Sequence, residues 1–156
     1  MRDHAAPERV TRRIPRWIFR FPELIFRLRL GFLAPWWLML VTTGRRSGRP
    51  RRVVLDVIRR DDGRLWIIAA DGRRADFVRN IEADPRVEVW HRGSRHRATA
   101  RPLEEADAAI FAVDLYRRRP GYLRAVYRML GERIESEEDV RRLASATLPI
   151  QLRLED

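Results

Sequence analysis

Short hydrophobic runs separated by turn residues recur along the chain from residue 37 onward, and this pattern predicts β-strands. Several runs alternate hydrophobic with polar residues, which is typical of strands that bury one face. Two turns, at residues 61–64 and 92–94, are placed to join neighbouring strands as hairpins. We expect six strands, over residues 37–43, 53–60, 65–70, 87–91, 95–101 and 148–154.

Hydrophobic residues at helical spacing occupy much of the sequence between these strands. They predict helices over residues 75–83, 104–118 and 120–130, and Ser136 with Asp139 forms a capping-box-like start for one more. Strands joined in hairpins, with helices inserted or appended, predict an α+β domain around a small antiparallel barrel. We expect a single domain over residues 1–156, since a chain of this length usually forms one core.

The N-terminal part of the chain is amphipathic. Hydrophobic residues between Ile14 and Leu28 fall on one helical face and arginines largely on the other, while Pro22 predicts a kink or two short helices. We expect residues 1–13 to be disordered and residues 14–35 to form a helical lead-in. The apolar run over residues 30–41 is shorter than the roughly 20 residues of a transmembrane span, and no signal-peptide cleavage pattern follows it.

This N-terminal segment has two interpretations. In the first interpretation, its hydrophobic stripe packs on the domain, as such stripes commonly do. Alternatively, residues 14–37, which contain Trp17, Trp36 and Trp37 with flanking arginines, lie in a membrane interface. We expect a cytoplasmic protein, which in the second case is peripheral on the inner face of the cell membrane.

Charge is distributed unevenly along the chain. The net charge is +11 over 156 residues, and lysine is absent. The first 60 residues hold 15 arginines and 4 acids, whereas the remaining residues hold 18 of each. An excess confined to one part of the chain predicts an anionic partner, which is a phosphorylated ligand, a membrane surface or nucleic acid.

Few residues suit a metal or a covalent mechanism. The absence of cysteine excludes disulfides, thiolate metal sites and a cysteine nucleophile, and agrees with a reducing cytoplasm. His91 and His96 flank a hairpin turn without a nearby pair of acids, so we expect them at the surface and not as metal ligands.

The most informative segment is the loop over residues 42–52, which joins two predicted strands. Gly44 and Gly48 let backbone amides turn toward an anion, Ser47 adds a hydroxyl donor, and paired arginines bind phosphate or carboxylate. The loop lacks the Gly-Lys-Ser/Thr ending of a Walker P-loop and the three glycines of a dinucleotide fingerprint. Gly48-Arg49-Pro50-Arg51 is also similar to cores that bind the DNA minor groove, and a solvated basic loop is a third interpretation.

The loop Thr43-Gly44-Arg45-Arg46-Ser47-Gly48-Arg49-Pro50-Arg51 resembles the signature of the deazaflavin-dependent nitroreductase family, small split-barrel oxidoreductases of actinobacterial type that use coenzyme F420. The resemblance covers most of residues 16–154. It implies an α+β fold with a small antiparallel split β-barrel of the FMN-binding type, preceded by the amphipathic helical segment and with helices packed on the barrel. Further matching segments are Ala75-Asp76-Phe77-Val78-Arg79-Asn80-Ile81, Asp84-Pro85-Arg86-Val87, Arg119-Pro120-Gly121-Tyr122 and Leu148-Pro149-Ile150.

The resemblance also implies where the cofactor binds. F420 combines a flavin-like ring with a tail of phosphate and glutamates, so it needs an apolar slot and a row of basic groups. Phe77 and Asn80 match positions near the cofactor, although Asn80 equally suits a structural role between helix and strand. The implied loop contacts are Thr43, Arg45, Arg46, Ser47, Gly48 and Arg51, and the implied ring contacts are Val53, Val54, Leu55, Ala69, Ala70 and Asp71.

The implied activity is hydride transfer from reduced F420, a step that needs little from side chains because the cofactor performs it. Tyr122 is the candidate to line the substrate pocket or donate a proton, and its alternative is a core tyrosine stacked with Val126. Asp56 stands where nitroimidazole-reducing relatives have tyrosine, and Phe77-Val78 stands where many have Trp-Tyr. We therefore expect a quinone-like or other electron-poor lipophilic acceptor. The alternatives are a split barrel that binds FMN, haem or no cofactor, and a basic module for membrane or nucleic acid. Since the basic loop suits the tail of the implied cofactor, nucleic acid ranks third among the anionic partners and is not expected.

Overall fold

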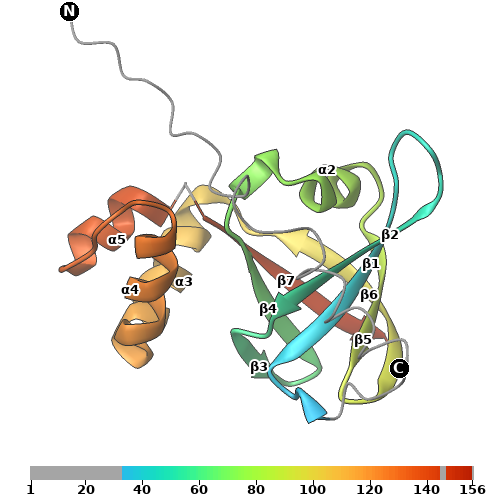
Figure 1. The fold of residues 1–156 in the computed structure, drawn as a ribbon, viewed down its shortest axis with the longest axis horizontal. Coiled ribbons are helices and arrows are strands. Elements are labelled where there is room, and N and C mark those ends of the chain that lie inside the picture. The colour runs from blue at the N-terminus through green and yellow to red at the C-terminus, as the bar shows by residue number, and fades with distance from the viewer. Residues whose placement is uncertain (1–32, 145–146, 156) are drawn as a thin grey trace, which may run out of the picture.

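A computed structural model describes residues 33–144 and 147–155, in which seven strands form one curled sheet (Figure 1). The strand order is β2-β1-β5-β6-β7-β4-β3, and every neighbouring pair is antiparallel. The strands are β1 (Trp37–Thr43), β2 (Pro50–Asp56), β3 (Arg59–Asp61), β4 (Arg64–Ala69), β5 (Arg86–His91), β6 (Ser94–Pro102) and β7 (Leu148–Glu155). The helices are the 3-10 turn η3 (Gly72–Arg74), α2 (Asp76–Ala83), α3 (Glu105–Arg118), α4 (Pro120–Met129) and α5 (Glu137–Leu143).

The interior of the curled sheet is filled by the inward-facing residues of its strands. Leu38, Leu40, Val89 and Ile150 are almost completely inaccessible to solvent, as strand alternation requires of positions two residues apart. Helix α2 contributes Val78 and Ile81 to the same core. The fold is therefore α+β, with its sheet curled around a hydrophobic centre.

A second core joins helices α3, α4 and α5 to the sheet, and these helices form a separate group beside it in Figure 1. The indole of Trp66 on β4 stacks on Phe111 of α3, with ring centroids 6.4 Å apart. The buried Tyr127 of α4 donates a hydrogen bond from its hydroxyl to the carbonyl of Leu143 in α5, at 3.1 Å. The first contact holds α3 against β4, and the second joins α4 to α5.

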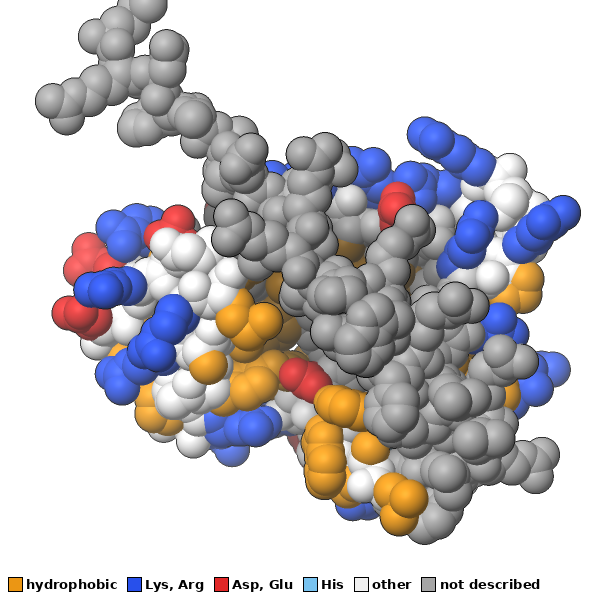
Figure 2. Space-filling view, in the orientation of Figure 1, with side chains coloured by type: hydrophobic (Ala, Val, Ile, Leu, Met, Phe, Trp, Pro, Cys, Tyr) orange, Lys and Arg blue, Asp and Glu red, His pale blue; other side chains and the backbone are white. Residues whose placement is uncertain are grey.

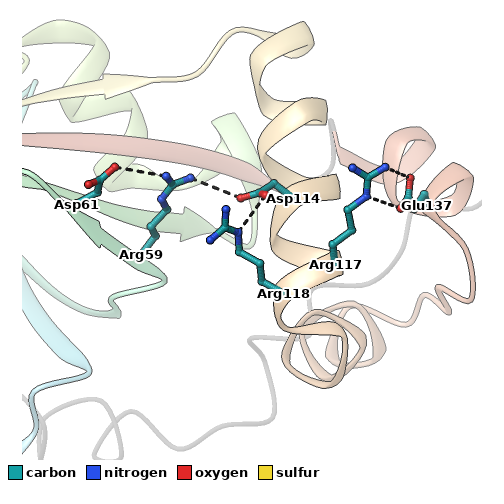
Figure 3. Close-up of polar contacts among 6 residues, drawn as sticks. All are labelled: Arg59, Asp61, Asp114, Arg117, Arg118 and Glu137. Carbon is teal, nitrogen blue, oxygen red and sulfur yellow. Dashed lines mark hydrogen bonds and ion pairs between the residues drawn. The ribbon is translucent and has the colours of Figure 1, made fainter.

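Ion pairs reinforce this attachment at the surface (Figure 3). The Arg59 guanidinium on β3 lies 3.4 Å from Asp61 and 3.5 Å from Asp114 of α3, and Arg118 shares Asp114 at 3.0 Å. Arg117 of α3 pairs with Glu137 of α5 at 2.6 Å. Exposed pairs of this kind contribute at most about 1 kcal/mol each, so the apolar contacts dominate.

Most predicted elements are confirmed. The bounds of β1 are those expected, and the predicted helices and hairpin turns are present within one or two residues. The capping box is also present: the Asp139 amide donates to the Ser136 hydroxyl, and the Asp139 carboxylate accepts from the Ser136 amide, both at 3.2 Å. Local sequence signals are sufficient for these features.

The predicted strand over residues 53–60 is wrong as a single element, because only its last residues, in β3, form the expected hairpin with β4. β2 pairs with β1, and only β3 pairs with β4, so the sheet has seven strands instead of six. Between β2 and β3 the chain crosses from one edge of the sheet to the other. There the Val57 amide donates to the Trp36 carbonyl at 2.7 Å and the Ile58 amide donates to the Trp66 carbonyl at 2.8 Å. The hydrophobic pattern does not reveal the crossing because apolar residues continue on both sides of it.

The expected surface position of His91 is also wrong. Its side chain is buried, and its Nδ1 lies 3.0 Å from the Trp37 carbonyl oxygen on the neighbouring strand. Strand alternation accounts for this, because His91 shares the inward face of β5 with Val87 and Val89. Burial lowers the pKa of His91, so the ring is held neutral.

The expected disorder of residues 1–13, and nearly all of the lead-in expected over residues 14–35, lie outside the described residues. Within residues 33–144 and 147–155, no helix has the length and hydrophobicity needed to cross a membrane.

Candidate functional site

The predicted anion-binding loop is the turn of the β1–β2 hairpin. Its ends are held by the pairing of Thr43 with Pro50 and by a 2.9 Å hydrogen bond from the Gly44 amide to the Arg49 carbonyl. A Cβ atom at Gly44 would lie 2.8 Å from the Ser47 hydroxyl oxygen and 3.1 Å from the Arg49 carbonyl oxygen, so a larger residue would require neighbouring atoms to move. Gly48 has a φ of +64°, which also favours glycine. The two glycines therefore fix the shape of the loop.

Arginines gather around this hairpin. Figure 2 shows basic side chains in the region where Figure 1 draws the loop between β1 and β2. Arg46, Arg49 and Arg51 are exposed and form no ion pair with any described residue. Guanidinium groups that are charged, exposed and close together attract phosphate and carboxylate. The loop therefore keeps cationic groups available for an anion.

Arg45 differs from its neighbours because it is bound to helix α2. Its Nη2 lies 3.1 Å from the Asp76 carboxylate, and its Nη1 donates to the side-chain oxygen of Asn80 at 3.1 Å. The Asn80 oxygen also accepts from the Arg45 backbone amide at 3.2 Å. Part of the Arg45 guanidinium is thus engaged within the protein.

Asn80 is buried between the helix and the loop, with only 3% of its surface exposed. Its side-chain NH₂ donates to the Thr42 hydroxyl at 3.1 Å, which connects α2 to β1. These contacts agree with the structural role expected for Asn80, because the Asn80 side chain holds both β1 and the loop that follows β1. A buried amide satisfied on both sides is costly to replace.

A cavity of about 550 Å³ lies along β2, from Arg52 to the strand's last residue, Asp56. Its wall is mainly hydrophobic, and cavities of this size and character are typical of small-molecule sites. Its lining residues are Trp37, Arg52, Val53, Val54, Leu55, Asp56, Ile68, Ala70, Asp71, Ala75 and Phe77.

The predicted site residues divide into three groups. Val53, Val54, Leu55, Ala70, Asp71 and Phe77 line the cavity together. Thr43, Arg45, Arg46, Ser47, Gly48 and Arg51 lie in the adjoining hairpin. Ala69, Asn80 and Tyr122 are not part of the cavity wall, since Ala69 and Asn80 are buried behind it and Tyr122 lies on α4.

Tyr122 is half-buried and adjoins the cavity through Asp56. Burial, followed by the negative charge of Asp56, raises the pKa of Tyr122 to about 12, against an opposing effect of the Arg119 charge. The Arg119 guanidinium lies over the Tyr122 ring, 4.7 Å from its centroid. The contact with Asp56 distinguishes Tyr122 from a simple core tyrosine, although it also belongs to the second core. A phenol with such a pKa retains its proton at neutral pH.

Sequence reasoning missed five residues of the cavity wall: Trp37, Arg52, Asp56, Ile68 and Ala75. Trp37 and Ile68 have the pattern of ordinary strand residues, so no local signal marks them. Asp56 does carry a signal, because it is the one acid in a strongly basic stretch of the sequence.

The wall and the hairpin suit the cofactor that the resemblance implies. A planar aromatic ring requires an apolar slot, which Val53, Leu55, Ile68 and Phe77 supply. An anionic tail requires cations outside that slot, and the exposed arginines begin where the cavity wall reaches Arg52. The residues present therefore fit coenzyme F420.

Solved structures share the fold. An F420-H2 dependent reductase, FDR-A, is 22% identical with a TM-score of 0.50, over 77% of this chain and 94% of that chain. A pyridoxamine 5'-phosphate oxidase-related, FMN binding protein from Nostoc punctiforme is 14% identical with a TM-score of 0.55, over 91% of this chain and 82% of that chain. The fold is thus a split barrel of the FMN-binding type, while a comparison with functionally curated proteins found no match.

A family model gives the more specific result. The model for F420H(2)-dependent quinone reductase matches residues 29–134, a range that includes the hairpin, the cavity wall and Tyr122. The chain belongs to the F420H(2)-dependent quinone reductase family, and it is an F420-dependent oxidoreductase.

Proposed function

We propose that the protein reduces a quinone or a similar electron-poor lipophilic acceptor in the cavity beside β2. The observation that supports this best is the hydrophobic wall of a cavity of about 550 Å³ next to exposed arginines. When bound, reduced F420 supplies a hydride, and a proton completes the two-electron reduction of a quinone to its quinol. The protein's own contribution is to bind, orient and exclude water.

The ring slot is formed by β2 and α2. Val53 and Leu55 pack on the barrel core while also facing the cavity, so their positions are fixed from behind. Phe77 at the start of α2 closes another side of the wall. A rigid apolar slot holds an aromatic ring in one plane and leaves room for an acceptor next to it.

The hairpin arginines are proposed to bind the anionic tail. Arg46 and Arg51 are exposed, whereas the Arg45 guanidinium also contacts Asp76 and Asn80. We therefore assign phosphate and glutamate binding mainly to Arg46 and Arg51, and assign to Arg45 the additional task of holding the loop against α2.

Titration of the purified protein with F420, followed by cofactor fluorescence, tests this proposal. We expect binding at micromolar concentrations, about tenfold weaker binding in Arg46→Ala and Arg51→Ala, and quinone reduction when the reduced coenzyme is supplied. Arg153→Ala is a matched control, because Arg153 is an exposed arginine on β7 outside the hairpin and the cavity wall. Absence of F420 binding at micromolar concentrations would disprove the proposal. Tighter binding of FMN than of F420 would show that FMN is the cofactor instead.

A peripheral membrane contact through residues 14–37 is a further proposal. In its described part, Leu33 and Trp36 expose 61% and 57% of their surface, which is unusual for large hydrophobic residues. Lipophilic acceptors such as membrane quinones would then be close to the cavity. Cosedimentation with anionic vesicles is expected, and Trp36→Ala should reduce it; equal cosedimentation with neutral vesicles at high salt would contradict an electrostatic contribution.

A further inference from the structure

The cavity wall has the opposite charge to the rest of the protein. Its charged residues are one arginine, Arg52, and two aspartates, Asp56 and Asp71, so the wall has a net charge of −1. The whole chain has a net charge of +11. A negative site in so basic a protein is a local feature that the overall composition does not explain.

Asp56 is placed to act on whatever enters the cavity. It is the last residue of β2 and pairs across the sheet with Trp37, another residue of the wall. Strand alternation puts Asp56 and Val54 on the face opposite Val53 and Leu55, which pack on the barrel core. Val54 and Asp56 thus contribute to the cavity wall from that face of β2.

No arginine within the described residues forms an ion pair with Asp56. The Arg119 guanidinium lies over the Tyr122 ring and donates to the Ile58 carbonyl at 3.4 Å. Among the described residues, the negative charge of Asp56 is therefore not paired with a cation.

We infer that Asp56 determines the charge selectivity of the acceptor site, so that the protein reduces neutral and cationic acceptors and rejects those carrying a carboxylate or sulfonate. This inference rests on the proposed function and specifies its substrate class. The Asp56 carboxylate is an exposed part of the cavity wall, so an anionic acceptor in the cavity would lie close to a like charge and be repelled. Selectivity of this kind depends on the repulsive contact as much as on the attractive one.

The experiment compares three naphthoquinones that share one ring system and carry no charge, a sulfonate or a trimethylammonium group. Each is reduced by the F420-loaded protein and by its Asp56→Asn variant, and the readout is the ratio of kcat/KM for the cationic to the anionic compound. Comparing this ratio between variants cancels differences in reduction potential among the quinones. We expect the ratio to fall at least about tenfold in Asp56→Asn.

Asp62→Asn is the matched control, because it removes the same charge from an exposed turn outside the cavity wall. Its φ of 40° is a conformation that asparagine also tolerates. We expect Asp62→Asn to keep the wild-type ratio. An equal fall in both variants would show that net charge, and not the position of Asp56, is responsible, and would overturn the inference.

A binding measurement separates this inference from the proposed function. Quenching of Trp37, which lines the cavity, reports binding of the same three compounds to the F420-loaded protein without turnover, with Trp37→Phe to identify the signal. If no quinone is reduced, the proposed function fails, yet the inference still predicts tighter binding of the cationic compound that is lost in Asp56→Asn. If the wild-type protein shows no charge preference in binding or turnover, the inference is wrong while quinone reduction stands.

Discussion

The side chain of Asn80 donates a hydrogen bond to the hydroxyl of Thr42, 38 residues earlier in the chain, at 3.1 Å. The bond is buried, and the same side chain accepts two hydrogen bonds from Arg45. One amide thus connects a helix, a strand and the arginine-rich hairpin. The shape of the hairpin therefore depends on a residue outside it.

Replacement of Asn80 by alanine should destabilise the protein and weaken F420 binding together. The variant leaves the Thr42 hydroxyl and the Arg45 amide without their partner, which typically costs about 1–3 kcal/mol. Thermal unfolding and cofactor titration measure the two effects. Arg79→Ala, on an exposed neighbouring position of α2, should change stability by no more than about 0.5 kcal/mol. An Asn80→Ala variant with unchanged stability would contradict the role described.

Alanine at Gly44 should distort the hairpin. The new Cβ would lie 2.8 Å from the Ser47 hydroxyl oxygen and 3.1 Å from the Arg49 carbonyl oxygen, and the latter belongs to the backbone and cannot rotate away. We expect a loss of about 1–3 kcal/mol in the free energy of unfolding. Gly121→Ala provides the comparison, since nothing lies within 4 Å of its added Cβ, and a helical alanine there should be neutral or stabilising. Equal effects of the two substitutions would rule out this explanation.

The raised pKa of Tyr122 gives a prediction at alkaline pH. An unfolded tyrosine ionises near pH 10, whereas Tyr122 in the folded protein ionises near pH 12. The proton is held more tightly in the folded state, so its stabilising contribution is complete below pH 10 and is lost as the pH rises from 10 to 12. Absorbance of tyrosinate should show the late ionisation, and Tyr122→Phe should remove it. Asp56→Asn should shift it to lower pH; an unshifted titration would mean that Asp56 does not act on Tyr122.

His91 gives a prediction at acidic pH. Burial lowers its pKa below the ordinary value of 6.5, so protonation occurs more readily in the unfolded chain. Its contribution to stability is present above pH 6.5 and is lost as the pH falls through the lower folded pKa. The midpoint of thermal unfolding should fall between pH 7 and pH 5, and less steeply in His91→Gln. His96→Gln is the control on the partner strand, and an equal change there would argue against His91 as the source.

Elements defined by local signals could be predicted from the sequence, whereas long-range contacts could not. The capping box of Ser136 and Asp139, the alternation in β6 and the glycine turns each depend on residues close together in the chain. The crossing at Val57 and Ile58 depends on carbonyl groups of Trp36 and Trp66, which lie in other strands or turns. No pattern within the hydrophobic run specifies those partners.

The candidate site shows the same division. The hairpin glycines and arginines form one continuous segment, so both their chemistry and their place were predictable. The contact of Asp56 with Tyr122 brings together the end of β2 and the first turn of α4, and only the tertiary structure shows it. The burial of His91 could have been predicted from strand alternation, because Val87 and Val89 lie on the same face of β5.

The position of β2 at the end of the strand order has a consequence for association between molecules. No strand within residues 33–144 and 147–155 pairs with the outer side of β2, and such an edge is a template onto which a second chain can add. Arg51 and Arg52 are exposed at the start of this strand, and two copies approaching edge to edge would bring these like charges together. The arginines that suit an anionic tail should therefore also oppose aggregation, and high salt or their neutralisation should make the protein more prone to form β-rich aggregates.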